Sequence, residues 1–287
     1  MTTVHDAPDT IAEAVGAGQI SGRVWLYVNY HCNLACLYCL TESAPRVDPR
    51  MLEQDHVLTL ARQARDLGFT ALGITGGEPF LLRWLPDLLT EVSEILPVVC
   101  LSNGTLFTPN LVERMRPLAE RPVAIQISLD RPDPIANDEM RGPENFKKVL
   151  AAIPRLREAG ITVRMATTVE RDEITEHKTP EQERLCALHR KLGIPDDDHI
   201  IRPIVARGRA VTEGLGVAAT QDDLEPELTI TADGAFWNPF APTVYDGRLD
   251  TDLLLTRTTA PLETPASTML RLVQGRPAGT DATLGIR

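Results

Sequence analysis

The chain has 287 residues, of which 43% are hydrophobic and 24% are charged, and these fractions are typical of a folded globular protein rather than a disordered or fibrous one. Its 40 acidic and 29 basic residues give a formal net charge of −11, which repels a polyphosphate backbone and argues against a general nucleic-acid-binding protein. Since no apolar run reaches the ~18–20 residues of a membrane span and the first residues do not form a signal peptide, we expect a cytoplasmic protein without a membrane partner.

Strands and helices alternate along the sequence. Apolar, β-branched runs predict six strands, at residues 24–29, 70–75, 98–102, 123–129, 161–169 and 199–205. Helix-like segments fall between them, at residues 53–67, 85–95, 109–120, 144–159 and 180–192. Gly68 and Gly160 follow two of these helices, where C-terminal caps occur. The alternation predicts a parallel sheet with right-handed crossovers, either an open doubly wound sheet or a barrel.

Three of the five cysteines crowd just after the first predicted strand. Cys32, Cys36 and Cys39 stand in the string HCNLACLYCL, and an odd, clustered set in a chain without an export signal does not indicate disulfides. Three thiolates on one loop can hold three corners of a 4Fe–4S cube and leave one iron open. A structural zinc ion normally has four protein ligands, for which His31 is the adjacent candidate. The spacing favours the cluster, and zinc remains the alternative.

Polar residues also follow the other predicted strands. In parallel α/β folds the functional groups gather at the carboxyl ends of the strands, so these residues predict one shared site. In chain order they are Gly76, Gly77, Glu78, Pro79, Ser102, Asn103, Gly104, Ser128, Asp130, Thr167, Thr168 and Arg202.

With these motifs in place, the segment from about residue 24 to 210 resembles the radical S-adenosylmethionine (SAM) superfamily. The cysteine triad matches its cluster motif, Tyr38 fills the aromatic position before the third cysteine, and residues 76–79 match its GGEP motif. The resemblance implies an α/β fold, a partial (β/α)6 TIM-like barrel. It also implies one 4Fe–4S cluster, SAM bound to the open iron, and a flavodoxin- or ferredoxin-type reductant. Reductive cleavage of SAM would yield a 5′-deoxyadenosyl radical that takes hydrogen from the substrate.

The resemblance also suggests residues that hold SAM. Gly76 and Gly77 would let the backbone approach the methionyl end closely, and Pro79 would stiffen that turn beside Glu78. Arg141 with Ser128 looks like the pair that holds the SAM carboxylate, because a guanidinium binds a carboxylate with two parallel hydrogen bonds. The alternative for Arg141 is a surface arginine.

Four further positions carry less specific expectations. Ser102 and Asn103 would contact the ribose or methionine, or Asn103 would simply form a turn. Asp130 would contact SAM or substrate, or cap a loop. Thr168 would lie near the adenine.

The sequence divides into an N-terminal segment at 1–22, the barrel at 23–210 and a C-terminal extension at 211–287 that frays from about residue 274. Residues 227–240, ELTITADGAFWNPF, resemble the start of a SPASM/twitch-type extension, a strand–turn–strand around Asp233 and Gly234. Relatives carry auxiliary cluster cysteines there, whereas no cysteine follows Cys186 here. We expect this extension to cap the barrel or border the substrate site; the alternative is a hairpin that only packs.

A chain without an auxiliary cluster lacks a natural electron acceptor, which favours a redox-neutral rearrangement, elimination, decarboxylation or epimerisation. Epimerisation needs a hydrogen-atom donor. Cys100 lies two residues before Ser102, so both side chains face the same way, and Cys100 is a candidate donor. A core role is the alternative for this thiol.

We expect the substrate to be a small polar metabolite, such as a sugar, aminosugar or nucleoside of secondary metabolism, including antibiotic biosynthesis. The first alternative is a maturase of a ribosomally synthesised peptide, although only about 23 residues precede the first predicted strand. The second is a non-catalytic iron–sulfur or zinc protein.

Several residues have plainer expectations. The remaining histidines show no metal spacing and are expected on the surface or in packing, as is Cys186. Three arginines have two interpretations, an anionic-substrate site or ion pairs at the barrel rim, and they are Arg202, Arg207 and Arg209.

Overall fold

The computed structural model describes residues 8–48, 50–174 and 178–275. Its strands are β1 (Arg23–Tyr27), β2 (Ala71–Thr75), β3 (Val98–Ser102), β4 (Val123–Ser128), β5 (Thr162–Val169), β6 (His199–Pro203), β7 (Thr229–Thr231), β8 (Gly234–Phe236), β9 (Val244–Tyr245), β10 (Arg248–Leu249) and β11 (Leu254–Thr256).

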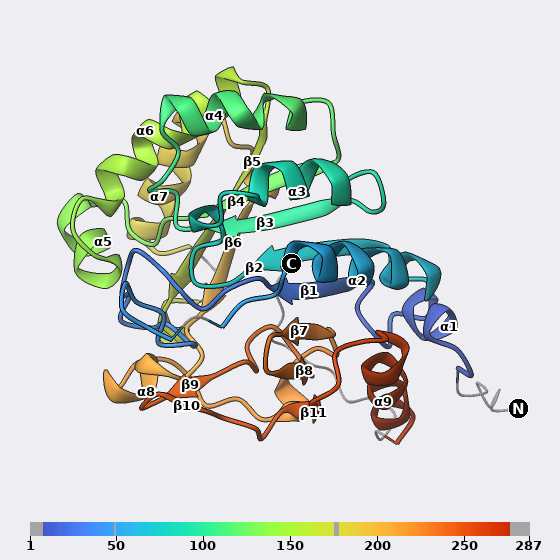
Figure 1. Ribbon diagram of the computed structural model, residues 1–287. Helices are drawn as coiled ribbons and strands as arrows, with labels where there is room; N and C mark the ends of the chain where they lie inside the picture. Colours follow the sequence, from blue (N-terminus) through green and yellow to red (C-terminus); the bar gives the residue numbers. More distant parts are fainter. Residues whose placement is uncertain (1–7, 49, 175–177, 276–287) are drawn as a thin grey trace, which may run out of the picture.

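Most helices follow a strand and return the chain to the start of the next one (Figure 1). The α-helices are α1 (Ile11–Gly16), α2 (Gln54–Asp66), α3 (Leu85–Val92), α4 (Pro109–Met115), α5 (Pro134–Arg141), α6 (Asn145–Glu158), α7 (Pro180–Lys191), α8 (Arg209–Thr212) and α9 (Glu263–Gln274). The short 3-10 helices are η1 (Pro79–Leu81), η2 (Arg116–Leu118), η3 (Arg171–Glu173), η4 (Asp196–Asp198) and η5 (Gln221–Asp223).

The main sheet has the order β11-β8-β7-β1-β2-β3-β4-β5-β6, and β1 to β6 pair in parallel. Strand β6 ends the sheet and does not pair with β1, so the six parallel strands form an open arc. The prediction of an α/β, partial TIM-like barrel is confirmed. The six predicted strands and the five predicted helices are also confirmed, with ends shifted by a few residues.

Some of the helices were not predicted, and three of them show why. Helix α1 has only six residues and is held by a capping box between Thr10 and Glu13. Helix α5 begins at the Asp133 cap but lies between a strand and another helix, in a segment for which no helix was predicted. Helix α9, which begins at Glu263, has no side-chain N-cap, so its start carries no sequence signal.

The parallel strands are apolar because helices cover them on one face and the barrel interior lies on the other. The side chains of Trp25 and Leu26 in β1 are completely buried. A Cβ at Gly73 in β2 would lie 2.2 Å from the Trp25 ring, so only glycine leaves room for this indole. Sheet packing therefore explains a glycine within a strand.

The C-terminal extension continues the main sheet. Strand β7 pairs in parallel with β1, through Trp25 with Thr229 and Leu26 with Ile230. Strands β7 and β8 form the antiparallel hairpin predicted around Asp233. Helix α9 ends at Gln274, and the frayed tail predicted from about residue 274 falls almost wholly on residues 276–287, which lie outside the described residues. Among the described residues, no helix has the length and apolar character needed to cross a membrane.

Candidate active site

A cavity of about 920 Å³, part of it open to solvent, lies at the carboxyl ends of the parallel strands. Most of the predicted site residues line it, and they are Cys32, Cys36, Tyr38, Cys39, Gly76, Gly77, Ser102, Asn103, Ser128, Arg141 and Thr168.

Six predicted residues are not among those that line the cavity, and all six are buried: Glu78, Pro79, Cys100, Gly104, Asp130 and Thr167. Glu78 and Asp130 hold lining residues in place by hydrogen bonds, as described below. Pro79 is the first residue of η1, behind the glycine turn. Cys100 is completely buried in β3, so the structure does not bring its thiol to the cavity wall together with Ser102.

Hydrogen bonds orient the three cysteines of the loop. The Cys32 sulfur accepts from the Leu34 backbone N–H at 3.4 Å and from Asn103 Nδ2 at 3.7 Å. The Cys39 sulfur lies 3.6 Å from the Thr41 hydroxyl. The Cys36 thiol donates to the Arg141 carbonyl at 3.6 Å. All three cysteines line the same cavity, and each sulfur has its own hydrogen-bond partners.

The start of α8 contacts the backbone of the cysteine loop. Arg209 Nη1 donates to the Cys36 carbonyl at 2.6 Å, and the Arg209 backbone N–H donates to the Cys39 carbonyl at 3.0 Å. Gly208 has a φ of +58°, and a Cβ there would lie 2.1 Å from the Leu40 carbonyl oxygen. Arg209 was expected to bind an anion or form a rim ion pair; instead it binds the backbone of the cluster loop.

The glycine turn after β2 packs on the backbone just before Cys32. The Gly77 N–H donates to the Asn29 carbonyl at 2.9 Å, and the Glu78 N–H donates to the His31 carbonyl at 2.9 Å. A Cβ at Gly77 would lie 2.3 Å from the His31 carbonyl oxygen. The backbones at Gly77 and His31 approach so closely that only glycine fits at position 77, whether or not a ligand also approaches it. The His31 ring is exposed and lies against the Pro45 carbonyl, so it does not join the three cysteines.

Glu78 accepts hydrogen bonds from β3 and from its own turn. Its Oε1 accepts from the Phe80 N–H at 3.0 Å, and its Oε2 accepts from the Asn103 N–H at 2.7 Å. The Ser102 hydroxyl lies 3.0 Å and 3.1 Å from the two oxygens. Burial raises the pKa of Glu78 to about 7, while the backbone donors Asn103 and Phe80 oppose that rise. The carboxylate thus ties the GGEP turn to Asn103, whose amide reaches Cys32.

Asp130 positions Arg141 beside the cavity. Asp130 Oδ2 accepts from Arg141 Nη1 at 3.1 Å and from the Tyr38 hydroxyl, which Arg141 Nη1 also contacts. Asp130 Oδ1 accepts from the Thr168 N–H at 2.9 Å. Burial lowers the pKa of Arg141, but the charges of Tyr38 and Asp130 outweigh burial, and the net shift is upward. Arg141 is therefore a buried cation rather than a surface arginine.

Two donors beside the cavity have no hydrogen-bond partner among the described residues. They are the buried Nε of Arg141 and the buried Nη1 of Arg202, a residue of β6 that lines the cavity. Arg202 is otherwise engaged through Nε, 3.4 Å from the Thr168 hydroxyl, and its guanidinium lies 5.8 Å from the Phe240 ring centroid. Unpaired buried donors are costly, so both point to anionic or carbonyl groups of bound molecules.

These residues fit a three-cysteine iron–sulfur cluster with SAM. Three thiols border one cavity, and the orphaned Arg141 Nε adjoins it as a donor for a carboxylate. Burial raises the pKa of Cys32 to about 12 and of Cys36 to about 11. Iron bound to these sulfurs would stabilise their thiolate form.

Sequence reasoning missed several residues of this site. Thr41 and Ser43 follow the third cysteine and are both buried, and their hydroxyls lie 2.7 Å apart. The Thr41 hydroxyl also contacts the Cys39 sulfur. Phe240 lines the cavity from the extension, and the Tyr27 hydroxyl donates to the neighbouring Pro239 carbonyl at 2.9 Å. Proximity to Cys39 was a usable signal for Thr41 and Ser43, whereas only the fold could bring Phe240 to the cavity.

Arg207, for which the sequence left open an anionic-substrate site or ion pairs at the barrel rim, forms ion pairs. The Arg207 guanidinium is buried and lies 3.0 Å from Asp250 and 2.5 Å from Asp252. These two ion pairs join the end of the barrel to the C-terminal extension.

Comparison with known proteins agrees with this geometry. The family model of the radical SAM superfamily matches residues 26–177, just over half of the chain. An AdoMet-dependent heme synthase of Oleidesulfovibrio alaskensis is 30% identical over 236 residues, which cover 82% of this chain and 55% of that protein. The mycofactocin maturase MftC of Mycolicibacterium smegmatis is 28% identical over 195 residues, which cover 68% of this chain and 48% of that protein. The chain spans about half the length of the curated relatives it matches.

Solved structures share the fold at low sequence identity. Native anSMEcpe with bound AdoMet has a TM-score of 0.59 at 12% identity, covering 85% of this chain and 79% of that one. Streptococcus suis SuiB bound to its precursor peptide SuiA has a TM-score of 0.55 at 19% identity, covering 74% and 46%. The family match, the three-cysteine cavity and the shared fold together show that this chain belongs to the radical SAM superfamily, as an enzyme that uses a 4Fe–4S cluster and SAM.

Proposed function

We propose that this enzyme abstracts a hydrogen atom from a small polar metabolite that carries an anionic group. When bound, the reduced cluster and SAM supply a 5′-deoxyadenosyl radical. The observation that carries the substrate proposal is Arg202, whose unpartnered Nη1 is buried beside the same cavity as the three cysteines. A phosphate or carboxylate of a sugar, aminosugar or nucleoside would satisfy this donor.

The protein's own residues hold and orient the two cofactors. Cys32, Cys36 and Cys39 would bind three irons. Arg141, with its Nη1 fixed by Asp130, would donate from its free Nε to the SAM carboxylate beside Ser128. Asp130 would therefore orient the Arg141 guanidinium without itself contacting SAM.

Other residues position the ligands or exclude water. The Thr168 N–H is bound to Asp130, so its backbone is held beside the cavity near Arg202. The Asn103 amide donates to Asn33 and Cys32 and its oxygen accepts from Thr105, so it shapes the loop. Phe240 adds a buried apolar wall from the extension.

A redox-neutral net reaction fits the cysteine distribution. The printed sequence has two cysteines outside the triad, Cys100 in β3 and Cys186 in α7, and neither lines the cavity. They cannot form a second cluster beside the substrate. We therefore infer rearrangement, elimination, decarboxylation or epimerisation, with an initiating electron from a flavodoxin- or ferredoxin-type protein.

A peptide substrate is the second candidate, because one relative is named a maturase and one structural neighbour was solved with a precursor peptide. The two candidates differ in what Arg202 should do. For a small anionic metabolite, it would contact the group that dominates binding. For a peptide, most binding contacts would lie outside the cavity.

The test has two stages. The cluster is first reconstituted anaerobically and reduced, and SAM cleavage is followed as 5′-deoxyadenosine, with the Cys32→Ala/Cys36→Ala/Cys39→Ala variant as the inactive control. Anionic sugars and nucleosides are then compared with candidate precursor peptides for substrate-dependent 5′-deoxyadenosine. Arg202→Gln should raise the KM for the metabolite at least tenfold, about 1.4 kcal/mol of lost binding, without changing iron content. Turnover of a peptide alone, unaffected by Arg202→Gln, would refute the proposal.

A further inference from the structure

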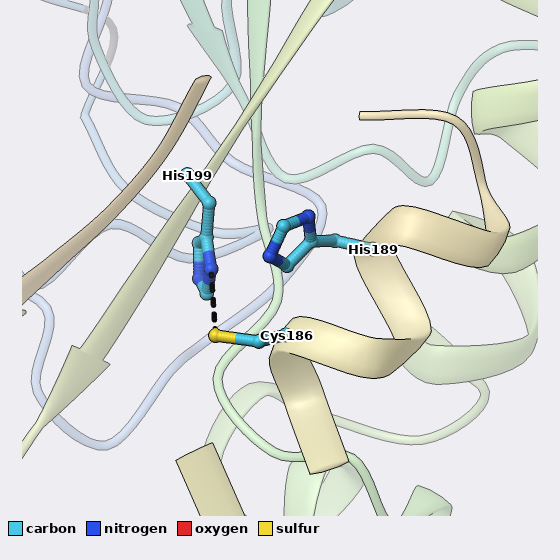
Figure 2. Close-up of side chains that lie close together, drawn as sticks. All are labelled: Cys186, His189 and His199. Carbon is cyan, nitrogen blue, oxygen red and sulfur yellow. Dashed lines mark hydrogen bonds between the residues drawn. The ribbon is translucent and has the colours of Figure 1, made fainter. Parts of the chain in front are cut away.

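Away from the cavity, Cys186, His189 and His199 form a second cluster of metal-ligand types (Figure 2). Cys186 and His189 stand three residues apart on α7, so they share one helix face, and His199 is the first residue of β6. One ligand atom from each residue lies within 4.8 Å of the other two. Cys186 and His189 are both at most 2% exposed.

Hydrogen bonds determine which nitrogen of His189 is free. Its Nδ1 lies 2.9 Å from the Ile194 carbonyl, which can only accept, so Nδ1 carries the proton. Nε2 therefore presents a lone pair. That atom is buried and has no hydrogen-bond partner among the described residues.

His199 is held in the complementary way. The Thr167 hydroxyl donates its one proton to the Leu129 carbonyl at 2.7 Å, so its oxygen accepts from His199 Nε2 at 2.8 Å. The lone pair of His199 is then on Nδ1. Nδ1 lies 3.8 Å from the Cys186 sulfur, along the dashed line in Figure 2.

Two histidine lone pairs and one sulfur thus converge on one point, and each histidine donates its other N–H to an oxygen. Metal-binding histidines are usually held in this way. Zinc bonds of ~2.3 Å to sulfur and ~2.1 Å to nitrogen put tetrahedral S and N ligands about 3.6 Å apart. The observed 3.8 Å between Cys186 Sγ and His199 Nδ1 is close to that distance.

We propose that Cys186, His189 and His199 bind a zinc ion, with a water molecule as the fourth ligand. Asp196 Oδ1 lies 3.6 Å from His189 Nε2, but the Asp196 carboxylate is paired with Arg190 and does not belong to the group of converging ligand atoms. On binding, the Cys186 thiol releases its proton to solvent.

The ion would join a helix to the barrel wall. Side chains alternate along β6, so His199 faces α7 while Arg202, three residues later, faces the cavity. The site is therefore separate from the iron cluster, and it does not depend on the proposed substrate.

The surroundings also offer a metal-free alternative. Lys178 Nζ lies 3.1 Å from the Cys186 sulfur, and the two imidazole rings are 4.5 Å apart. Without metal these contacts are simple packing. Lys178 is exposed, so its side chain can turn to solvent when a cation binds.

The test measures zinc in the full-length holoenzyme, independently of iron. We expect about one zinc ion per chain after exposure to zinc and removal of loosely bound metal. Zinc K-edge absorption should show one sulfur and three nitrogen or oxygen neighbours. A shell with three sulfurs would place zinc at the iron-cluster cysteines and overturn the proposal.

Variants then assign the ligands. Cys186→Ala and His199→Ala should each weaken zinc affinity at least about tenfold by chelator competition. Cys100→Ala removes a buried thiol elsewhere and should keep the zinc, as should the triple variant of the iron-cluster cysteines. Lys178→Met should bind zinc as tightly or more tightly, because it removes a competing cation. Failure of the wild-type protein to bind zinc, or equal affinity in Cys186→Ala, would refute the site without requiring any variant to be inactive.

Discussion

Replacement of Glu78 by glutamine tests whether the GGEP carboxylate supports the iron-cluster loop through Asn103. Each carboxylate oxygen of Glu78 accepts from a different backbone N–H, that of Phe80 on one side and that of Asn103 on the other. The Ser102 hydroxyl can turn and accept from an amide, but a backbone N–H cannot. Whichever way the introduced side-chain amide is oriented, its NH2 group therefore faces a backbone donor.

The expected cost follows from this geometry. One hydrogen bond to a charged acceptor is lost, about 1.5–3 kcal/mol, and the residue is completely buried, so an unsatisfied donor adds about 1–3 kcal/mol. We expect Glu78→Gln to lower the free energy of unfolding by about 1–2 kcal/mol, because the neutral amide avoids the cost of burying a charge and this offsets part of the loss. The comparison is made at about pH 8, because burial raises the pKa of Glu78 to about 7 and the carboxylate is charged above that value.

The assay is anaerobic urea unfolding of the reduced apoprotein, together with iron content after reconstitution. Iron retention should also fall, because the Asn103 amide that contacts Cys32 loses its anchor. Glu91→Gln, an exposed carboxylate on α3, is the matched control and should change stability by less than about 0.5 kcal/mol. If Glu78→Gln behaves like Glu91→Gln in both measurements, the support that we assign to Glu78 is wrong.

Three further predictions address other parts of the chain. Arg209→Met should lower iron per chain after reconstitution, because it removes the donors to the Cys36 carbonyl, while the exposed Arg65→Met should not. Burial raises the pKa of Glu227 from 4.5 to about 7. Between these two pH values the folded state therefore binds more protons than the unfolded state, and the free energy of unfolding falls as the pH rises. Glu227→Gln should remove up to about 3 kcal/mol of this pH dependence in urea unfolding. Arg141→Met should cost about 3 kcal/mol by leaving the Asp130 charge unpaired, and adding Asp130→Asn should recover at least about 1 kcal/mol.

Each of these predictions has a contradicting result. Equal iron in Arg209→Met and the wild type would mean that α8 does not support the cluster loop. A pH profile for Glu227→Gln that matches the wild type would remove Glu227 as the source of the slope. Additive losses in Arg141→Met and Asp130→Asn would show that the two side chains do not interact energetically.

The sequence was sufficient for the architecture of the barrel. Apolar runs of strand length alternate with amphipathic helices, and each carries local punctuation such as Gly68 after α2 and Pro109 at the start of α4. These signals are local, so they need no tertiary information. The short helices α1 and α5 were missed because they have six and eight residues and little periodicity to detect.

The chemistry of the cluster was also readable from sequence, since Cys32, Cys36 and Cys39 lie on one loop and their spacing is itself the signal. The roles of the residues around them were not. Glu78 was expected to contact SAM, and Asp130 to contact SAM or substrate or to cap a loop. In the structure Glu78 binds Asn103 and Asp130 binds Arg141 by hydrogen bonds. Hydrogen-bond partners distant in sequence leave no local pattern.

By itself, the sequence determined the fold class, the cysteine triad and the GGEP turn, because periodicity and short motifs depend on neighbours along the chain. Only the tertiary structure decided that Phe240 of the extension borders the same cavity as the cysteines, and that Cys186 meets His199. The physical reason is that parallel strands bring their carboxyl ends to one edge and pack helices against their faces, so side chains far apart in sequence become neighbours only after the sheet has formed.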